Sequence, residues 1–411
     1  MGDTITRKRV ILWGVGNMAE RVYDMLDRQM CAIVGVVDGR YRDMGVFHEH
    51  PVECPDILRE RPFDVVVVTP KRWWTITDAC RDMGISDDRI VCYWKDSGRD
   101  APIFERRMFK YAEMEDELQK WKNRALNAPY EYAANPPIRV RSGLELLQRI
   151  LRERCSVSRF GDGEFSTILG EERYIWFQSK NATLGERLLD VLHRRDGNLV
   201  LTVQDNLGDL SCYKEWVADI FRKYYVEKNR RVSIMGLLDP TYEYYDTCVT
   251  RPYITYRDPH HGEAFFRLWR QIFANRNILL VEGAKSRFGV GSDLLSTAKS
   301  VRRILAPAKN AFSVYDEILA AVQRHAASGD LVLVSLGPTA TVLAADIARA
   351  GWQAIDIGQL DNEYDWYHMG AERQVPIPGK MAAEVYSGSI EGHCNDKAFF
   401  SQVVEIVKEQ V

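Results

Sequence analysis

Two carboxylates stand two residues apart in the stretch VSRFGDGEFSTI, residues 157–168, where Asp162 and Glu164 alternate with Gly161 and Gly163. If this stretch is extended, residues two apart point to the same side, so both carboxylates can converge on one cation. Hard cations such as Mg²⁺ or Mn²⁺ prefer oxygen ligands and share them with substrate phosphates. The triplet therefore predicts a metal site, and a solvated turn is the alternative.

Three later segments carry residue types that suit a diphosphate. Glycines present backbone N–H groups to phosphate oxygens, an arginine forks onto them, and a helix N-terminus attracts negative charge. The segments are VEGAKSRFGVGSD, PAKNAF and LGPTAT, and their candidate contacts are Ser286, Arg287, Asp293, Lys309, Asn310 and Thr339. Simple helix capping is the alternative for each loop taken singly.

A fourth segment, DIGQLDNEYDW of residues 356–366, places four acids between apolar positions and ends on Trp366. Such a cluster can hold a general base or shape a sugar pocket around an aromatic platform. An acidic surface loop is the alternative.

Near the N-terminus, residues 14–19 read GVGNMA and fit the pattern G-x-G-x-x-G/A of a dinucleotide-binding turn. Gly14 and Gly16 stand between a predicted strand and a predicted helix, and Asp38 ends the next strand, where a carboxylate can bind a ribose hydroxyl. The turn fits a bound nucleotide or a CoA-like ligand. It fits equally a tight strand-to-helix turn without a ligand, which needs glycine for its backbone conformation.

The elements that position these residues are alternating strands and helices. RVILWGVG, AIVGVVD and FDVVVVTP predict a small Rossmann-like domain with a parallel sheet, within residues 1–100. NLVLTV, NILLVEG, LVLVSLGP and QAIDIG predict a second α/β domain over residues 136–411. Ligands of open α/β sheets bind beyond the carboxyl ends of the strands, which is where the segments above lie.

Residues 101–135 between the two domains predict a helical linker. Phe104, Met108, Tyr111, Glu115, Leu118 and Trp121 recur every three or four residues, so residues 104–126 form an amphipathic helix with a mostly apolar stripe. The helix either connects and packs on one domain or pairs two subunits as a homodimer.

Composition limits the function classes. The 411 residues contain 55 Lys+Arg against 58 Asp+Glu, which argues against a broad basic face for nucleic acid. No apolar run reaches the roughly 18–20 residues that span a bilayer, and the N-terminus lacks a signal-peptide pattern. The 8 cysteines are scattered, as expected for reduced thiols in a cytoplasmic protein.

Seven blocks resemble the GT-D-type glycosyltransferases in sequence order. They are SRFGDGEF, FQSKNATLGERL, RPYI, VEGAKSRFGVGSDLL, PAKNAFSVYDEIL, LGPTATVLAADIA and QAIDIGQLDNEYDW, and they extend over about residues 138–385. The family transfers sugars from nucleotide donors, as in bacterial protein glycosylation of serine-rich adhesins. The N-terminal domain falls outside the resemblance.

The resemblance implies a metal-dependent transferase that moves a hexose from a UDP-sugar to a glycan or glycoprotein. Asp162 and Glu164 would hold Mn²⁺ or Mg²⁺ at the diphosphate, and Asp361 or Glu363 would serve as the base for the acceptor hydroxyl. The implied nucleotide contacts are Arg159, Ser286, Arg287, Asp293, Lys309, Asn310 and Thr339.

Two other classes remain open from the sequence. An NAD(P)-dependent oxidoreductase would act through the N-terminal turn, but it gives the blocks after residue 138 no purpose. A non-catalytic module that binds sugar nucleotides or glycans would have little need of a metal site.

Overall fold

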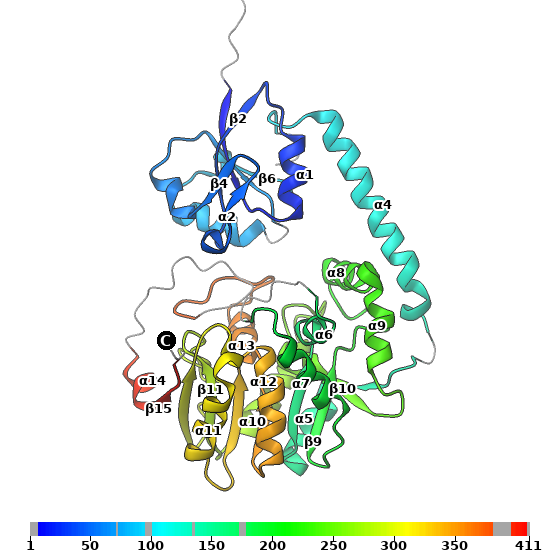
Figure 1. Cartoon of the computed structure of the whole chain (residues 1–411), viewed down its shortest axis with the longest axis vertical. Coiled ribbons are helices and arrows are strands. Elements are labelled where there is room, and N and C mark those ends of the chain that lie inside the picture. The colour runs from blue at the N-terminus through cyan, green and yellow to red at the C-terminus, as the bar shows by residue number, and fades with distance from the viewer. Residues whose placement is uncertain are drawn as a thin grey trace, which may run out of the picture. The chain divides into compact units, whose positions relative to one another are not determined.

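The computed structural model of the chain describes residues 7–70, 73–94, 101–133, 136–171, 178–380 and 396–408. These residues form two compact units, which divide between residues 122 and 123, inside the long helix α4 (Arg106–Glu131; Figure 1). In the part of the chain that the structure describes, no helix combines the length and the apolar character needed to cross a membrane.

The first unit is built on a six-stranded sheet of order β3-β4-β2-β1-β5-β6 among its described residues. The strands are β1 (Lys8–Trp13), β2 (Cys31–Val37), β3 (Val46–Phe47), β4 (His50–Glu53), β5 (Val65–Val68) and β6 (Ile90–Cys92). The helices are α1 (Asn17–Met25) and α2 (Trp73–Asp82), with short 3₁₀ turns η1 (Tyr41–Asp43), η2 (Pro55–Arg59) and η3 (Asp87–Arg89).

The predicted parallel arrangement holds for five of these strands, and the sixth differs. β4, β2, β1, β5 and β6 pair in parallel, whereas β3 runs antiparallel to β4 at the edge of the sheet. Only two residues connect β3 and β4, and the first of them, His48, has φ 48°. So short a hairpin has no periodicity that the sequence could reveal.

The second unit is built on nine strands among its described residues, in the order β15-β12-β11-β13-β14-β8-β9-β10-β7. All neighbouring strands pair in parallel, as predicted for an α/β domain. The strands are β7 (Val140–Arg141), β8 (Ser156–Phe160), β9 (Leu199–Val203), β10 (Tyr244–Asp246), β11 (Asn277–Gly283), β12 (Ser300–Ala306), β13 (Leu331–Ser335), β14 (Gln353–Asp356) and β15 (Val403–Ile406).

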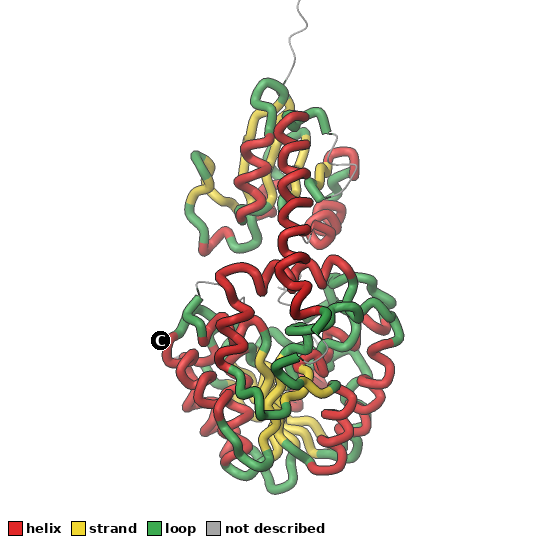
Figure 2. Tube along the Cα trace, turned by 90° about the vertical axis from the view of Figure 1, so that its right-hand side faces the viewer, coloured by secondary structure: helices red, strands yellow, loops and turns green. Residues whose placement is uncertain are grey.

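Helices cover both faces of this sheet, as Figure 2 shows. They are α5 (Gly143–Glu153), α6 (Asp162–Ile168), α7 (Ala182–His193), α8 (Glu215–Val226), α9 (Arg230–Leu237), α10 (His261–Phe273), α11 (Tyr315–His325), α12 (Pro338–Arg349), α13 (Leu360–His368) and α14 (Lys397–Gln402), with 3₁₀ turns η4 (Glu227–Asn229), η5 (Thr247–Thr250) and η6 (Ala311–Val314). In α12, residues 338–347 are all buried. A helix that is apolar on all sides belongs inside a core, which explains the run TATVLAADIA.

The strand order places a topological switch point at β11 and β13. The chain leaves β11 toward β12 on one side, and it leaves β13 toward β14 on the other. The loops after neighbouring strands therefore diverge and leave room at the carboxyl ends, which is where α/β proteins bind ligands.

Helix α4 is longer than the sequence predicted. It begins after Phe104, which is buried in the core of the first unit, and it continues through Pro129 to Glu131. The linker predicted over residues 101–135 is therefore helical from Arg106 to Glu131, and residues 134–135 lie outside the described residues.

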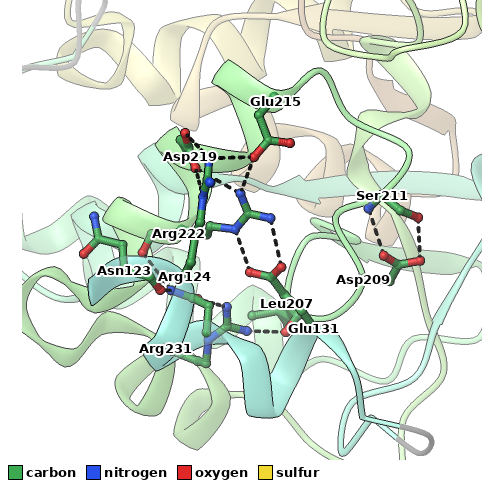
Figure 3. A network of polar contacts seen from close by, with 11 residues as sticks. Asn123, Arg124, Glu131, Leu207, Asp209, Ser211, Glu215, Asp219, Arg222 and Arg231 are labelled. Carbon is green, nitrogen blue, oxygen red and sulfur yellow. Dashed lines mark hydrogen bonds and ion pairs between the residues drawn. The ribbon is translucent and has the colours of Figure 1, made fainter. Parts of the chain in front are cut away.

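The last turns of α4 are fixed to the second unit by a network of ion pairs (Figure 3). Arg222 of α8 binds both carboxylate oxygens of Glu131, at 2.9 and 3.0 Å, and also contacts Glu215 and Asp219. Arg124 binds the same two acids, at 2.9 Å to Glu215 and 3.1 Å to Asp219. These contacts explain why the second unit begins inside the helix.

Candidate active site

Because all nine strands are parallel, their carboxyl ends share one edge of the sheet of the second unit. Loops after β8, β9, β10, β11, β12, β13 and β14 all leave from this edge. The chemistry-bearing segments predicted within residues 136–411 lie in these loops and in the first turns of the helices that follow them.

Asp162 and Glu164 are brought to this edge, but not in the predicted extended stretch. The chain turns into helix α6 at Asp162, directly after Gly161, so the two acids do not share a side as residues of a strand would. Glu164 stands at the third helical position, and its Oε2 accepts a hydrogen bond from Gly161 N–H at 2.7 Å. Acids favour the first turn of a helix because they satisfy its unpaired N–H groups and its dipole, and this preference sets the helix start.

The environment of Glu164 raises its pKa to about 7. Burial is the main cause, and the carboxylate of Asp356 at the end of β14 adds to it, while Arg159 opposes the shift. Two nearby carboxylates with one guanidinium leave excess negative charge, which a cation would relieve.

Arg159, a predicted nucleotide contact, is instead paired inside the protein. Its Nε donates to Asp356 Oδ1 at 3.2 Å, and its Nη1 donates to Thr250 Oγ1 at 2.7 Å. Gly358, with φ +53°, passes so close that a Cβ there would lie 2.7 Å from the guanidinium carbon. The side chain therefore joins β8 to the loops after β10 and β14, and its predicted contact with a nucleotide stays a prediction.

A second acidic pair, which the sequence analysis missed, follows β9 and β10. Asp205 donates its backbone N–H to Asp246 Oδ1 at 3.3 Å. Asp205 is exposed as a residue, yet surrounding protein atoms desolvate its carboxylate, and this desolvation together with Asp246 and Asp209 raises its pKa to about 7. Its position directly after the predicted strand NLVLTV was the available signal.

Asp205 and Asp162 occupy equivalent places on neighbouring strands. Phe160 of β8 pairs with Val203 of β9, and each acid follows its strand residue by two positions. A Cβ on Gly161, one residue earlier, would lie 3.9 Å from Gln204 Nε2. The β8 and β9 loops thus run side by side where the DxE acids begin.

The glycine-rich loop after β11 is held by buried charge. Glu282 is fully buried, accepts Phe288 N–H at 2.7 Å and pairs with Arg303 at 2.5 Å. Gly289 N–H donates to Asp361 at 3.2 Å. Two N–H groups that a diphosphate cradle would use are therefore already bonded to carboxylates, which corrects the simple cradle predicted from the glycines.

Ser286 and Arg287 lie half-buried in that loop. Arg287 has φ 52° and donates from Nη1 to the carbonyl of Gly379 at 2.6 Å. The guanidinium therefore links the loop to the segment that follows α13. Its role toward a nucleotide stays a prediction.

Asp361 and Glu363, the predicted bases, are both buried in the first turn of α13. Glu363 Oε2 accepts the N–H groups of Tyr253 and Ile254, each at 2.9 Å. Asp361 pairs with Lys380 at 3.2 Å in addition to its bond with Gly289. A base must reach the acceptor hydroxyl, so these contacts favour a positioning role for both acids.

Asp293, another predicted nucleotide contact, is held on helices α10 and α13. Its carboxylate accepts a hydrogen bond from Tyr364 Oη at 2.6 Å and pairs with Arg270. Arg270 and Tyr364 line an open pocket of about 720 Å³ between the two helices. The structure thus ties Asp293 to the helices that form this pocket.

The last predicted contacts hold a segment across the ends of β12 and β13. Asn310 Oδ1 accepts Ser179 N–H at 2.8 Å, and the buried Thr339 donates from Oγ1 to Gln178 Oε1 at 3.4 Å. Lys309 is exposed beside them. Asn310 and Thr339 therefore fix residues 178 and 179 at the site edge.

Metal binding would need oxygen atoms from outside the protein. Within the described residues, no three His, Cys, Asp or Glu side chains gather as a group that could hold an ion. One or two carboxylates completed by substrate phosphates are the usual magnesium arrangement. Because Asp162 and Glu164 do not share a side of the helix, metal binding by both acids stays a prediction.

The N-terminal turn satisfies its own polar groups. Gly14 has φ +109°, and a Cβ there would lie 2.6 Å from Thr69 Oγ1, whereas Gly16 has open space around it. Asp38 accepts the N–H of Val15 at 3.3 Å and of Arg40 at 2.9 Å, and it forms an ion pair with the Arg40 side chain. These contacts favour a structural turn, because Arg40 neutralises the carboxylate that a ribose would use.

Comparisons with known proteins divide the chain in the same way. Residues 157–385 match the family model described as glycosyltransferase GT-D fold, and residues 6–91 match one described as C2185-like, N-terminal. The chain is 34% identical over 259 residues to a probable glycosyl transferase Gly of Streptococcus gordonii. It is 33% identical over 268 residues to the glycosyltransferase GlyD of Streptococcus pneumoniae.

The matched stretches are 63% and 65% of this chain but only 37% and 32% of those relatives, so the chain spans about a third of their length. A solved structure described as a highly conserved domain of unknown function with a distinct glycosyltransferase fold aligns with a TM-score of 0.62 and 35% identity, covering 66% of this chain and 96% of that one. A new glycosyltransferase from Streptococcus sanguinis aligns with a TM-score of 0.61 and 33% identity, covering 66% of this chain and all of that one.

Proposed function

The chain belongs to the glycosyltransferase family of the GT-D fold, and we propose that it transfers a hexose from a UDP-sugar to a hydroxyl group of a glycan or glycoprotein, with Mn²⁺ or Mg²⁺ bound at Asp162 and Glu164. The observation that carries the proposal is the convergence of the DxE helix start, the β11 loop and the α12 N-terminus on one edge of a parallel sheet. The known relatives support transfer of a sugar.

The residues of this edge divide into those that would bind the donor and those that keep the surrounding loops in position. Arg287 on the β11 loop, together with the exposed Lys309, supplies positive charge near the switch point. Arginine forks onto phosphate oxygens, whereas lysine acts as a point charge. Arg159, Glu282 and Asp361 keep the loops of this edge in place.

Departure of the nucleoside diphosphate is the step that needs charge stabilisation. Asp162 and Glu164 would provide hard oxygen donors for a divalent cation, and the cation would supply positive charge at the leaving group, as Lewis-acid metals do in group transfer. The place of both acids at the start of α6 keeps them in the first helical turn, next to the β9 loop.

Asp205 is better placed than Asp361 or Glu363 to accept the proton of the acceptor hydroxyl. It is exposed at the carboxyl end of β9, whereas both α13 acids are buried and bonded. A base works best when its pKa lies near the working pH, and the pKa of Asp205 is raised to about 7.

A donor panel tests the proposal. The full chain is incubated with UDP-, GDP-, TDP- and CMP-sugars, each with Mn²⁺, with Mg²⁺ or with excess chelator, and released nucleotide and sugar are measured. We expect hydrolysis or transfer from a UDP-sugar that stops on chelation and returns with Mn²⁺ or Mg²⁺. Turnover that survives complete chelation would contradict the metal role. Turnover of another class of sugar nucleotide, with none of the UDP-sugars, would contradict a UDP-sugar as the donor.

A further inference from the structure

Helix α4 carries an apolar stripe with the spacing of a coiled coil. Seven successive positions alternate steps of three and four residues, which places their side chains along one seam of a helix. This α4 stripe consists of Tyr111, Met114, Leu118, Trp121, Ala125 and Ala128, and Tyr132 continues the spacing in the turn directly after the helix. Its five large side chains are between 62% and 83% exposed. So long a row of exposed large apolar groups marks a contact surface on a water-soluble protein.

The stripe differs from the one expected from the sequence. Phe104 lies in the core of the first unit, and Glu115 pairs with Arg21 at 3.1 Å. Met114 and Tyr132 take their place in the exposed row.

Within the described residues, each unit holds α4 mainly on the side of the helix away from the stripe. In the first unit, Arg21 contacts Asp116 at 2.6 Å and the carbonyl of Ala112 at 3.1 Å. In the second, Asn127 donates to the Arg222 carbonyl at 3.1 Å, and Glu131 binds the same arginine. With 3.6 residues per turn, these four positions lie on the half of the helix opposite Leu118.

The charges beside the seam suit a second copy of the same helix. With the stripe at positions a and d of a heptad, Lys110 and Glu117 stand at g, while Glu115 and Lys122 stand at e. In a parallel pair in register, each g residue meets the next e residue of the other chain. Lys110 would then face Glu115, which also pairs with Arg21 of its own chain. Glu117, which pairs with Lys120 of its own helix, would face Lys122, so both contacts between the helices join opposite charges.

The available area is comparable with a small specific interface. At ~150–200 Å² for a large side chain, the stripe exposes on the order of 600 Å² per chain, close to the ~600 Å² per partner at the low end of stable complexes. A membrane surface is a poorer match, because α4 has six basic against five acidic residues and so no basic polar face.

We propose that α4 pairs with α4 of a second copy of this chain as a parallel two-stranded coiled coil. The interface is separate from the candidate active site, and the pairing does not depend on the proposed transferase activity.

Sedimentation of the full chain over a wide range of concentration tests the pairing. We expect a species of twice the 47.3 kDa chain mass. Leu118→Glu should raise the dissociation constant by at least about tenfold, since it puts a charge at the centre of the seam. The matched control is Leu126→Glu on the same helix, because Leu126 is 51% exposed but lies off the seam. Thermal melts of both variants check that the fold persists.

Orientation is tested separately by charge exchange and by crosslinking. Glu117→Lys alone should weaken the dimer, and adding Lys122→Glu should restore it. Leu118→Cys should crosslink to itself under mild oxidation, whereas Lys120→Cys, on the solvent side, should not. The unmodified chain is the background, because Cys212 is exposed.

Three results would overturn the proposal. The first is a chain that stays monomeric at every concentration. The second is a dimer that Leu118→Glu and Leu126→Glu affect equally. The third is a folded monomer that binds vesicles of anionic lipid through the stripe, with binding lost in Leu118→Glu. Failure of Leu118→Cys to crosslink within a proven dimer would contradict the parallel register.

Discussion

Arg159 on β8 and Asp356 at the end of β14 form a buried pair, with Nε and Oδ1 3.2 Å apart, although 197 positions separate them in the chain. Burial raises the pKa of Asp356, and the guanidinium opposes that shift. Thr341 and Gly358 donate to the same carboxylate, each at 3.2 Å. The pair joins two neighbouring strands where the candidate site begins.

Removal of one partner of this pair should destabilise the second unit. Asp356→Ala leaves the Arg159 guanidinium buried without its carboxylate, at an expected cost of about 3–5 kcal/mol in the free energy of unfolding. Urea denaturation measures this change. Glu153→Gln breaks the exposed pair with Arg149 and should stay within error of the unmodified protein. Equal effects of the two changes would contradict the importance of the buried pair.

Loss of either DxE acid should reduce turnover while the fold remains. Asp162→Asn and Glu164→Gln should each lower the rate by roughly 100-fold or more, the scale of one lost electrostatic contact in a transition state. Asp190→Asn on the exposed surface of α7 serves as the control. Circular dichroism and the rate over a titration of Mn²⁺ are the measurements. Unchanged rates in both variants would favour a solvated helix start.

The rate should rise with pH as Asp205 loses its proton. A base works only when deprotonated, so a group with a pKa raised to about 7 gives a rate that increases through pH 7 and then levels off. Asp205→Asn should lower the rate and remove the part of this rise that Asp205 causes. Glu164, whose pKa is also raised to about 7, would contribute a rise of its own because a cation ligand must be deprotonated. A profile whose shape is unchanged in Asp205→Asn would assign the base to another residue, and Asp361→Asn and Glu363→Gln are the next variants to measure.

Arg287→Ala should weaken the binding of UDP more than the binding of uridine. A guanidinium donates paired hydrogen bonds to phosphate oxygens rather than to the nucleobase. Calorimetric titration of both ligands gives the comparison. Arg287→Lys should recover part of the lost UDP affinity, since lysine restores the positive charge but not the paired hydrogen bonds of the guanidinium. Equal losses for UDP and uridine would limit Arg287 to its contact with Gly379.

The sequence alone determined the fold class and the edge of the sheet where the site lies. Valine-rich and leucine-rich runs that alternate with helices specify parallel strands, and parallel strands bring the segments that follow them to one edge. Asp162, Arg287 and Thr339 could therefore be assigned to the same region before their neighbours were known. Ordered blocks of similarity added the family, which the family model confirms over residues 157–385.

Tertiary structure decided what each of these side chains contacts. Arg159 and Asp356, or Asp361 and Gly289, are brought together by strand order, and strand order leaves no local trace in the sequence. The sequence predicted an extended stretch at Asp162 and Glu164, whereas the structure begins helix α6 at Asp162. Unpaired N–H groups at a helix start attract carboxylates, which explains the difference. Packing then distinguished the acids: Glu363 is enclosed and its Oε2 accepts two N–H groups, whereas Asp205 is exposed as a residue although the protein desolvates its carboxylate.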